Sequence, residues 1–387
     1  MKKLVIKNIG QILSGKLEEP IFDGDCIIAI DGKITEWGAE KDLDCEGATT
    51  LVDAHGVTVM PGLIDSHIHP VIGDYTPRQQ QLNWIDSTLH GGVTTLISAG
   101  EVHMPGRPKD IVGLKAMAIA AQRWYENFRP SGVKVHAGAP VIEHGMVEQD
   151  FKDLADAGVT LLGEVGLGTV KDGKTAQQMV GWARKYGIQS TIHTGGPSIP
   201  GSGLIDADMV IETGTDVIGH INGGHSALPD DQIICLCESC SSAFEIVHNG
   251  NERSAVLALN TARELGKLDQ IILGTDGPAG SGVQPLGIMR MVAMLSAFGN
   301  VPAEKAFCFG HGNTSRQRNL NTGLIEAGYA ADFVLLDKAQ HAPGKTMLES
   351  VQLGNLPGVG MTVIDGEVTS GRSRNTPPAD RLPEHIK

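Results

Sequence analysis

The sequence is poor in cysteine, in positive charge and in long apolar runs. Six cysteines, unevenly spread over 387 residues, are too few for a disulfide framework, so we expect a reducing compartment, the cytoplasm. The 31 Lys and Arg face 45 Asp and Glu, and the net charge of −14 argues against nucleic acid as a partner. No run approaches the roughly 18 apolar residues of a membrane span, so no membrane partner is expected.

Hydrophobic residues are plentiful, at 41% of the chain, which is enough for a well-formed core. The 50 glycines indicate many tight turns and places where backbone or ligand approaches closely. The length fits one large barrel together with a smaller domain.

Both ends of the chain have the alternating pattern of β-strands. Residues 1–58 alternate apolar and polar positions, with Asp31-Gly32 as a hairpin turn, and the tail contains further strand-like runs around Asp365-Gly366. Each end alone has too few strands to be stable. We therefore expect residues 1–58 and 321–387 to pair into one β-sandwich domain.

The middle of the chain, residues 59–320, alternates short β-rich runs with helical patterns. The runs lie at 63–69, 91–98, 132–140, 158–166, 187–196, 214–223, 242–250 and 268–277. This alternation predicts an α/β fold, a (β/α)8 TIM barrel with a flanking β-sandwich domain built from both chain ends. An open doubly wound sheet would need a glycine-rich loop after its first strand, where His67-Ile68-His69 stands instead.

Side chains that can bind a metal follow the predicted barrel strands, and they lie where such barrels carry their chemistry. They are His67, His69, Glu164, His193, His220 and Asp276. The last four follow one another at 29, 27 and 56 residues (193 − 164, 220 − 193 and 276 − 220), close to one, one and two βα modules. This spacing places all of them in one ring at the barrel mouth.

Four imidazoles and two carboxylates in one ring suit two divalent metal ions that share a carboxylate. We assign His67, His69 and Asp276 to the first metal and His193 and His220 to the second, with Glu164 as the bridge. Zn and/or Fe are expected, with Mn or Co as alternatives. Taken singly, Glu164 or His220 could also be a polar group that caps a strand.

The motifs that carry these residues resemble those of a known enzyme superfamily. VMPGLIDSHIHP (59–70), HGGVTTLISAG (90–100), GTDG (274–277) and GLIEAGYAADFVLLD (323–337) are similar to motifs of the amidohydrolase superfamily, and the resemblance covers nearly the whole chain. Within it, the chain resembles the binuclear cyclic amide hydrolases, such as dihydroorotase, isoaspartyl dipeptidase and, most of all, the enamidases.

The resemblance implies a metal-dependent hydrolase that opens a cyclic amide, a lactam or an enamide such as a tetrahydropyridone carboxylate. A hydroxide that bridges the metals would attack the C–N amide bond, and Asp276 would carry the proton from this hydroxide to the departing nitrogen. Many binuclear members use a carboxylated lysine where Glu164 stands here, and Lys171 follows in the loop. The family also implies a homo-oligomer, with a tetramer expected.

Two alternative functions are considered. Mononuclear deaminases of heterocycles share most of these ligands but carry a Glu shortly after the fifth-strand histidine, where this chain has Thr194-Gly195-Gly196-Pro197. A non-catalytic scaffold of the same fold would have lost its metal ligands, whereas this chain keeps all of them. Both comparisons favour amide hydrolysis.

Substrate contacts are less marked in the sequence. A substrate carboxylate would need a cation or donors near the barrel mouth, and the candidates by position are Arg107, His225, His248 and Asn249. The run Cys235-Leu236-Cys237-Glu238-Ser239-Cys240 lacks a matching second pair and falls in a predicted helix, so we expect these cysteines to pack rather than to bind a metal.

Overall fold

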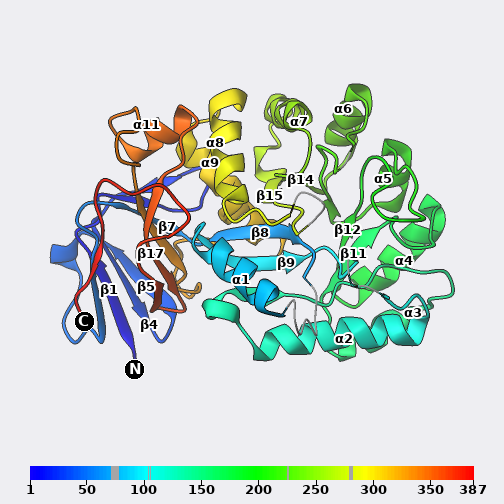
Figure 1. Cartoon of the computed structure of the whole chain (residues 1–387), viewed down its shortest axis with the longest axis horizontal. Helices are drawn as coiled ribbons and strands as arrows, with labels where there is room; N and C mark the ends of the chain where they lie inside the picture. Colours follow the sequence, from blue (N-terminus) through cyan, green and yellow to red (C-terminus); the bar gives the residue numbers. More distant parts are fainter. Residues whose placement is uncertain (71–77, 103, 105, 225, 279–281) are drawn as a thin grey trace.

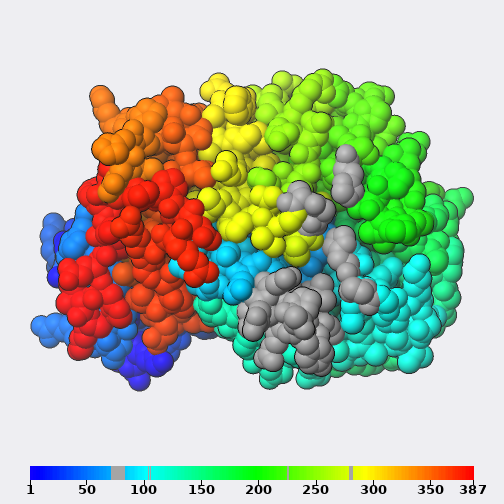
Figure 2. All heavy atoms as spheres, viewed as in Figure 1, coloured from blue at the N-terminus to red at the C-terminus, as the bar shows by residue number. Residues whose placement is uncertain are grey.

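The computed structural model describes residues 1–70, 78–102, 104, 106–224, 226–278 and 282–387. It consists of a β-sandwich beside a barrel of strands and helices (Figure 1). In the space-filling view the two ends of the chain, blue and red, gather in one lobe, and the middle of the chain forms the other (Figure 2). Among the described residues, no helix is long and apolar enough to cross a bilayer.

The sandwich consists of a five-stranded sheet in the order β19-β6-β1-β4-β5 and a six-stranded sheet in the order β18-β17-β16-β7-β2-β3. Its strands are β1 (Lys3–Lys7), β2 (Gln11–Leu13), β3 (Ile21–Phe22), β4 (Cys26–Ile30), β5 (Lys33–Gly38), β6 (Thr50–Asp53), β7 (Thr58–Pro61), β16 (Phe333–Asp337), β17 (Gly358–Ile364), β18 (Glu367–Ser370) and β19 (Glu384–His385). Both sheets contain strands from both ends of the chain, as predicted.

The two hairpin turns predicted in the sandwich are confirmed. Asp31 and Gly32 have φ of 47° and 78°, and Asp365 and Gly366 have φ of 50° and 77°. Positive φ at both central residues gives a turn whose twist matches that of the flanking strands, which explains the Asp-Gly sequence.

The barrel contains eight parallel strands within the described part of the chain, one in each predicted run. They are β8 (Leu63–Ile68), β9 (Val93–Ser98), β10 (Lys134–His136), β11 (Leu161–Val165), β12 (Gln189–Ile192), β13 (Val217–Ile218), β14 (Ala243–Val247) and β15 (Ile271–Gly274). They form the sheets β10-β9-β8 and β11-β12-β13-β14-β15. A parallel bridge between Ile68 and Gly277 joins one seam, and at the other the Gly163 amide donates to the Pro140 carbonyl at 2.9 Å.

Helices alternate with these strands and pack around the barrel (Figure 1). They are α1 (Arg78–Leu89), α2 (Ile111–Asn127), α3 (Glu148–Asp156), α4 (Gly173–Lys185), α5 (Ala207–Thr213), α6 (Asp230–Ser239), α7 (Glu252–Glu264) and α8 (Gly287–Gly299). The helices α9 (Ala303–Gly310), α10 (Gly312–Gln317) and α11 (Met347–Gln352) follow, with 3-10 turns at Glu40–Asp42, Pro130–Gly132 and Leu268–Gln270.

Capping residues define the ends of the helices that the sequence predicts. Asp172 caps the start of α4, where its carboxylate accepts the Thr175 amide at 2.9 Å, and the helix stops before Gly187, which has φ of 76° as predicted. The end of α1 differs by one residue from the prediction, because Gly92 rather than Gly91 has the left-handed conformation, with φ of 84°.

The chain passes from the sandwich to the barrel at Gly62. β7 pairs with β2 and β16 in the sandwich, and β8 begins directly afterwards in the barrel. A Cβ at Gly62 would lie 2.1 Å from Thr94 Oγ1, so only glycine fits this crossing. We propose the predicted domain boundaries, 1–58 with 321–387 for the sandwich and 59–320 for the barrel. The crossing at Gly62 lies within a few residues of the first of these boundaries.

Candidate metal centre

The six predicted ligands meet at the carboxyl ends of the barrel strands. His67 is the second-last residue of β8 and His69 lies just beyond that strand. Glu164 lies near the end of β11, and His193, His220 and Asp276 follow β12, β13 and β15 by one or two residues. Five of these side chains are at most 3% exposed, whereas that of Asp276 is 16% exposed. Asp276 therefore lies toward the opening of an otherwise buried cluster.

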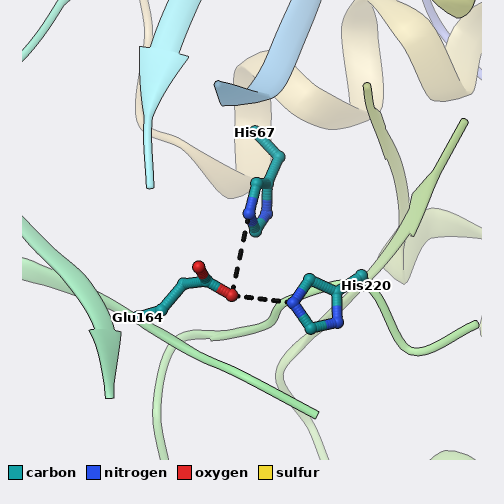
Figure 3. A group of neighbouring side chains, drawn as sticks. All are labelled: His67, Glu164 and His220. Atoms are coloured by element: carbon teal, nitrogen blue, oxygen red, sulfur yellow. Dashed lines mark hydrogen bonds and ion pairs between the residues drawn. The ribbon is translucent and has the colours of Figure 1, made fainter. Parts of the chain in front are cut away.

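Glu164 occupies the middle of the cluster, between His67 and His220 (Figure 3). Its Oε1 lies 2.7 Å from His220 Nε2, 3.2 Å from His193 Nδ1 and 3.8 Å from His67 Nε2. Its Oε2 lies 3.6 Å from His69 Nε2. The two carboxylate oxygens thus face different histidines, as a bridging ligand requires.

Asp276 contacts the same two histidine nitrogens as Glu164, those of His67 and His69. Its Oδ1 lies 3.1 Å from His69 Nε2 and 3.8 Å from His67 Nε2. His69 is held by a hydrogen bond between its Nδ1 and the Gly100 carbonyl, at 2.7 Å, which leaves Nε2 directed at the carboxylate.

These donors fit divalent metal ions. The atoms of His67, Glu164 and His220 lie within 4.8 Å of one another, and so do those of His67, His69 and Asp276. Ligands at about 2.0–2.2 Å from a cation lie roughly 2.8–3.6 Å apart, close to the separations observed here. His67 Nε2 is buried and makes no hydrogen bond to any residue that the structure describes, which is the state expected of a metal ligand.

The electrostatics of the cluster favour ionised carboxylates. Burial would raise the pKa of Glu164, but the hydrogen bonds from His193 and His220, together with the nearby His67, outweigh it and hold that pKa well below its usual range. The pKa of Asp276 is also lowered, because the interactions with His69 and His67 exceed the effect of burial. A cation at this position would replace the histidine protons as the balancing charge.

The backbone is strained at two of these residues. His220 has φ of 33° and Asp276 has φ of 58°, a region that residues other than glycine rarely adopt. Such strain persists only where the surrounding structure holds it, and it is frequent at functional sites. It directs both side chains toward the shared centre.

A buried network behind the centre was not predicted from the sequence. His67 Nδ1 lies 2.5 Å from Oε2 of Glu245 on β14, and Glu245 Oε1 accepts from Arg318 Nη2 at 2.9 Å. Arg318 also donates to the Ser66 carbonyl at 2.9 Å and to Thr191 Oγ1 at 3.0 Å. A hydrogen bond at Nδ1 fixes the ring so that Nε2 faces the cluster.

One sequence signal could have found Glu245. It is the single acid in the run AFEIV, whose neighbours Phe244 and Ile246 are buried in the main hydrophobic cluster. The alternating strand therefore turns Glu245 to the opposite face, toward the barrel interior. A buried acid there is stable only with a buried partner, which marks Glu245 as a candidate for the polar interior of the barrel.

The candidate substrate contacts lie at different places. Arg107 lines a cavity beside the loops that follow β10 and β11, whereas His248 lines a separate one, of about 280 Å³, with Arg290. Asn249 Nδ2 donates to the Asp276 carbonyl at 2.7 Å. His225 lies outside the described residues. A role of these residues in substrate binding stays a prediction.

Two other sequence features have structural explanations. Lys171 Nζ donates to the Gly166 carbonyl at 2.9 Å rather than joining the cluster. Cys235 and Cys237 lie in α6, and Cys240 caps it; all three are free thiols, and the carbonyls of Cys237 and Cys240 accept from Lys267 Nζ at 2.7 and 3.0 Å.

Replacing Gly274 tests how closely β15 packs against His67. A Cβ at this position would lie 2.5 Å from His67 Cβ, so we expect Gly274→Ala to displace His67, to lower the free energy of unfolding by about 1–3 kcal/mol and to reduce the bound metal. Denaturant unfolding and elemental analysis measure both effects. The control is Gly181→Ala, at an exposed position of α4 where a Cβ meets nothing within 4 Å, and it should stabilise the protein by about 0.5–1 kcal/mol. Equal behaviour of the two variants would contradict this account of β15.

A parallel barrel with a ring of histidines and carboxylates at its mouth defines the class of metal-dependent hydrolases. The model of the amidohydrolase family matches residues 58–369, and the chain belongs to this family. It is therefore a hydrolase that acts on C–N amide bonds.

Within the family, the chain is similar to enamidase. It is 44% identical over 381 residues to the enamidase of Eubacterium barkeri, a match that covers 98% of this chain and 99% of that protein. The crystal structure of enamidase superposes over 100% of both chains with a TM-score of 0.96 and 43% identity. The β-aspartyl dipeptidase of Fervidobacterium islandicum, at 17% identity and a TM-score of 0.65 over 98% and 99% of the two chains, shares the fold.

Proposed function

We propose that the protein opens a cyclic enamide, a tetrahydropyridone carboxylate, by hydrolysing its C–N bond with two divalent metal ions. The observation that carries the proposal is Glu164, whose Oε1 faces His193 and His220 while Oε2 faces His69. The full-length similarity to an enamidase supports the choice of substrate.

The residues that would hold the ions are those of the cluster. His67, His69 and Asp276 form one donor group, and Glu164 contacts His193 and His220 through Oε1 and His69 through Oε2. Histidine and carboxylate donors accept Zn and Fe, and also Mn or Co, so we propose Zn and/or Fe. When bound, such ions supply Lewis acidity and lower the pKa of water, and the remaining steps belong to the side chains.

Asp276 is the residue we propose for proton transfer. It is ionised, it lies toward the opening of the cluster and it contacts His69, so it is placed to accept a proton from the attacking water. It would then deliver that proton to the departing nitrogen, or to carbon when the leaving group is an enamine. Burial of the other ligands keeps bulk water away from the reacting bond.

Deamination is less well supported. Thr194, which follows His193, donates from Oγ1 to the carbonyls of Gly219 and His220 at 3.0 and 2.8 Å. It therefore has a structural role at the position where the deaminases place an acid, and Gly195 and Gly196 come next in the sequence.

The direct test is an assay of the metal-loaded protein on a panel of cyclic amides. We expect rapid hydrolysis of the tetrahydropyridone carboxylate and little of dihydroorotate, a hydantoin or a β-aspartyl dipeptide. Preferred hydrolysis of any of these three over the enamide would refute the assignment of substrate.

Replacing Glu164 tests the bridging role. Glu164→Gln removes one charge and one ligand oxygen, so we expect bound metal to fall from about two ions per chain to about one, with turnover reduced roughly 10- to 100-fold. Elemental analysis and steady-state kinetics measure this. Glu238→Gln, an exposed position on α6, is the control and should leave both values unchanged. Two tightly held ions in the Glu164 variant would show that another group bridges them.

We also propose a homo-oligomer, with a tetramer expected, located in the cytoplasm. Phe298 on α8 is 76% exposed, and Leu353, next to α11, is 61% exposed, so an apolar surface is available for subunit contact. The six free cysteines support a reducing compartment.

A further inference from the structure

A second polar site lies beside the metal centre. A cavity of about 570 Å³ opens between the loops that follow β9, β10, β11 and β12, and its walls include Arg107, Lys109, Lys171 and Glu143. Three cations thus face one carboxylate among the described lining residues, in a chain whose net charge is −14. Such a local excess of positive charge attracts anions.

Arg107 and Glu143 form an ion pair in this cavity but no hydrogen bond. The side chain of Arg107 is 7% exposed, and its Nη1 lies 3.5 Å from Glu143 Oε1, too far for a good hydrogen bond. Neither atom has a hydrogen-bond partner among the residues that the structure describes. The other oxygen of Glu143 accepts the Thr169 amide at 2.7 Å. A buried guanidinium nitrogen without an acceptor is rare in folded proteins, and it marks a place for a ligand oxygen.

Hydrogen bonds connect the segments that line the cavity to residues of the metal centre. Lys171 Nζ donates to the carbonyl of Gly166, two residues after Glu164, and the Leu167 amide donates to the Glu164 carbonyl at 3.3 Å. On the other side, Val102 follows Gly100, whose carbonyl holds His69. One part of the cavity wall therefore follows Glu164 closely in the sequence, and Val102 lies two residues after the carbonyl that holds His69.

We propose that this cavity binds a carboxylate of the substrate, with Arg107 as the main contact and Lys171 as a second cation. The inference rests on the proposed function, because it places the ring of the substrate between this cavity and the metal centre. A guanidinium binds a carboxylate through two parallel hydrogen bonds, which fixes its orientation. Val102 and Leu167, both buried, provide an apolar wall for the ring. The pocket thereby selects anionic cyclic amides over neutral ones.

The test compares two substrates, the tetrahydropyridone carboxylate and the same ring with a carboxamide in place of the carboxylate. In Arg107→Gln we expect the ratio of their kcat/KM values to fall about 10- to 100-fold, chiefly through KM for the carboxylate. Lys171→Gln should lower the same ratio by a smaller factor. Arg372→Gln, an exposed charge in the sandwich, controls for the change in net charge and should leave the ratio unchanged.

A variant that should improve binding of the carboxylate substrate shows that the loss in Arg107→Gln does not come from misfolding. Glu143→Gln removes the competing carboxylate while its side-chain oxygen can still accept the Thr169 amide, so KM for the carboxylate substrate should fall several-fold. A ratio that stays the same in Arg107→Gln, or a KM that rises in Glu143→Gln, would overturn the proposal.

Binding of nicotinate, a planar ring carboxylate with no amide bond to hydrolyse, separates this inference from the proposed function. Calorimetry on metal-loaded protein should show nicotinate binding that Arg107→Gln weakens at least tenfold, even if the enamide itself is not hydrolysed. Equal nicotinate affinity in wild type and variant would refute the carboxylate site and leave the metal centre unaffected.

Discussion

Asp276→Asn is expected to lower turnover about 10²- to 10⁴-fold, the range for loss of a general acid or base. Asparagine has nearly the same shape, and its side-chain oxygen can still face His69, so we expect the fold and much of the metal affinity to remain. It cannot carry a proton between water and the leaving nitrogen. The loss should therefore appear in kcat rather than in KM.

A change of leaving group makes this prediction specific to proton transfer. A lactone releases an alkoxide oxygen, which needs protonation less than an amide nitrogen does, so the deficit of Asp276→Asn should be smaller for a lactone than for the matching lactam. Metal analysis of the same samples separates proton transfer from loss of a ligand. The control is Asp23→Asn, at an exposed loop of the sandwich. Activity of Asp276→Asn within a few-fold of wild type would eliminate this role.

That the six proposed metal ligands meet at the barrel mouth could be predicted, because their positions depend on the repeat of the fold. Each βα module returns the chain to the same edge of the barrel, so residues one module apart, such as His193 and His220, arrive side by side. His67 and His69 follow from the two-residue period of a strand. No contact between distant residues had to be known for either step.

Strand lengths were predicted less well, and the reason is tertiary. The run 132–140 yields only β10 (Lys134–His136), because Gly138 has φ of 87° and turns the chain away. Beyond this turn the Gly163 amide donates to the Pro140 carbonyl, and that of Glu164 donates to the Ala99 carbonyl at 2.8 Å. This seam, which sets the depth of Glu164 in the barrel, depends on how three strand ends meet.

The support of His67 could not be predicted either. Arg318 follows α10, 73 residues beyond Glu245 and 252 beyond Ser66, and no local pattern relates these positions. The geometry emerges only when α10 packs against β8 and β15. Because the ion pair between Arg318 and Glu245 is buried, removing one of its charges should strongly reduce the stability of the protein.

Glu245→Leu is expected to destabilise the protein by about 3–5 kcal/mol, because it leaves the guanidinium of Arg318, whose side chain is 1% exposed, without its carboxylate. It should also weaken metal binding about 10- to 100-fold, since His67 loses the acceptor at Nδ1 that orients its ring. Denaturant unfolding of the metal-free protein and competition with a chelator measure the two effects. Glu238→Leu on the surface of α6 is the matched control.

The double variant Glu245→Leu with Arg318→Met separates charge from orientation. Removing both charges should restore most of the stability, because a buried ion pair can be replaced by apolar side chains with little loss. Metal affinity should stay low, because His67 Nδ1 still lacks its carboxylate. If the double variant instead recovered full metal affinity, Glu245 would act only by neutralising Arg318, and the orientation of His67 would have to come from elsewhere in the barrel.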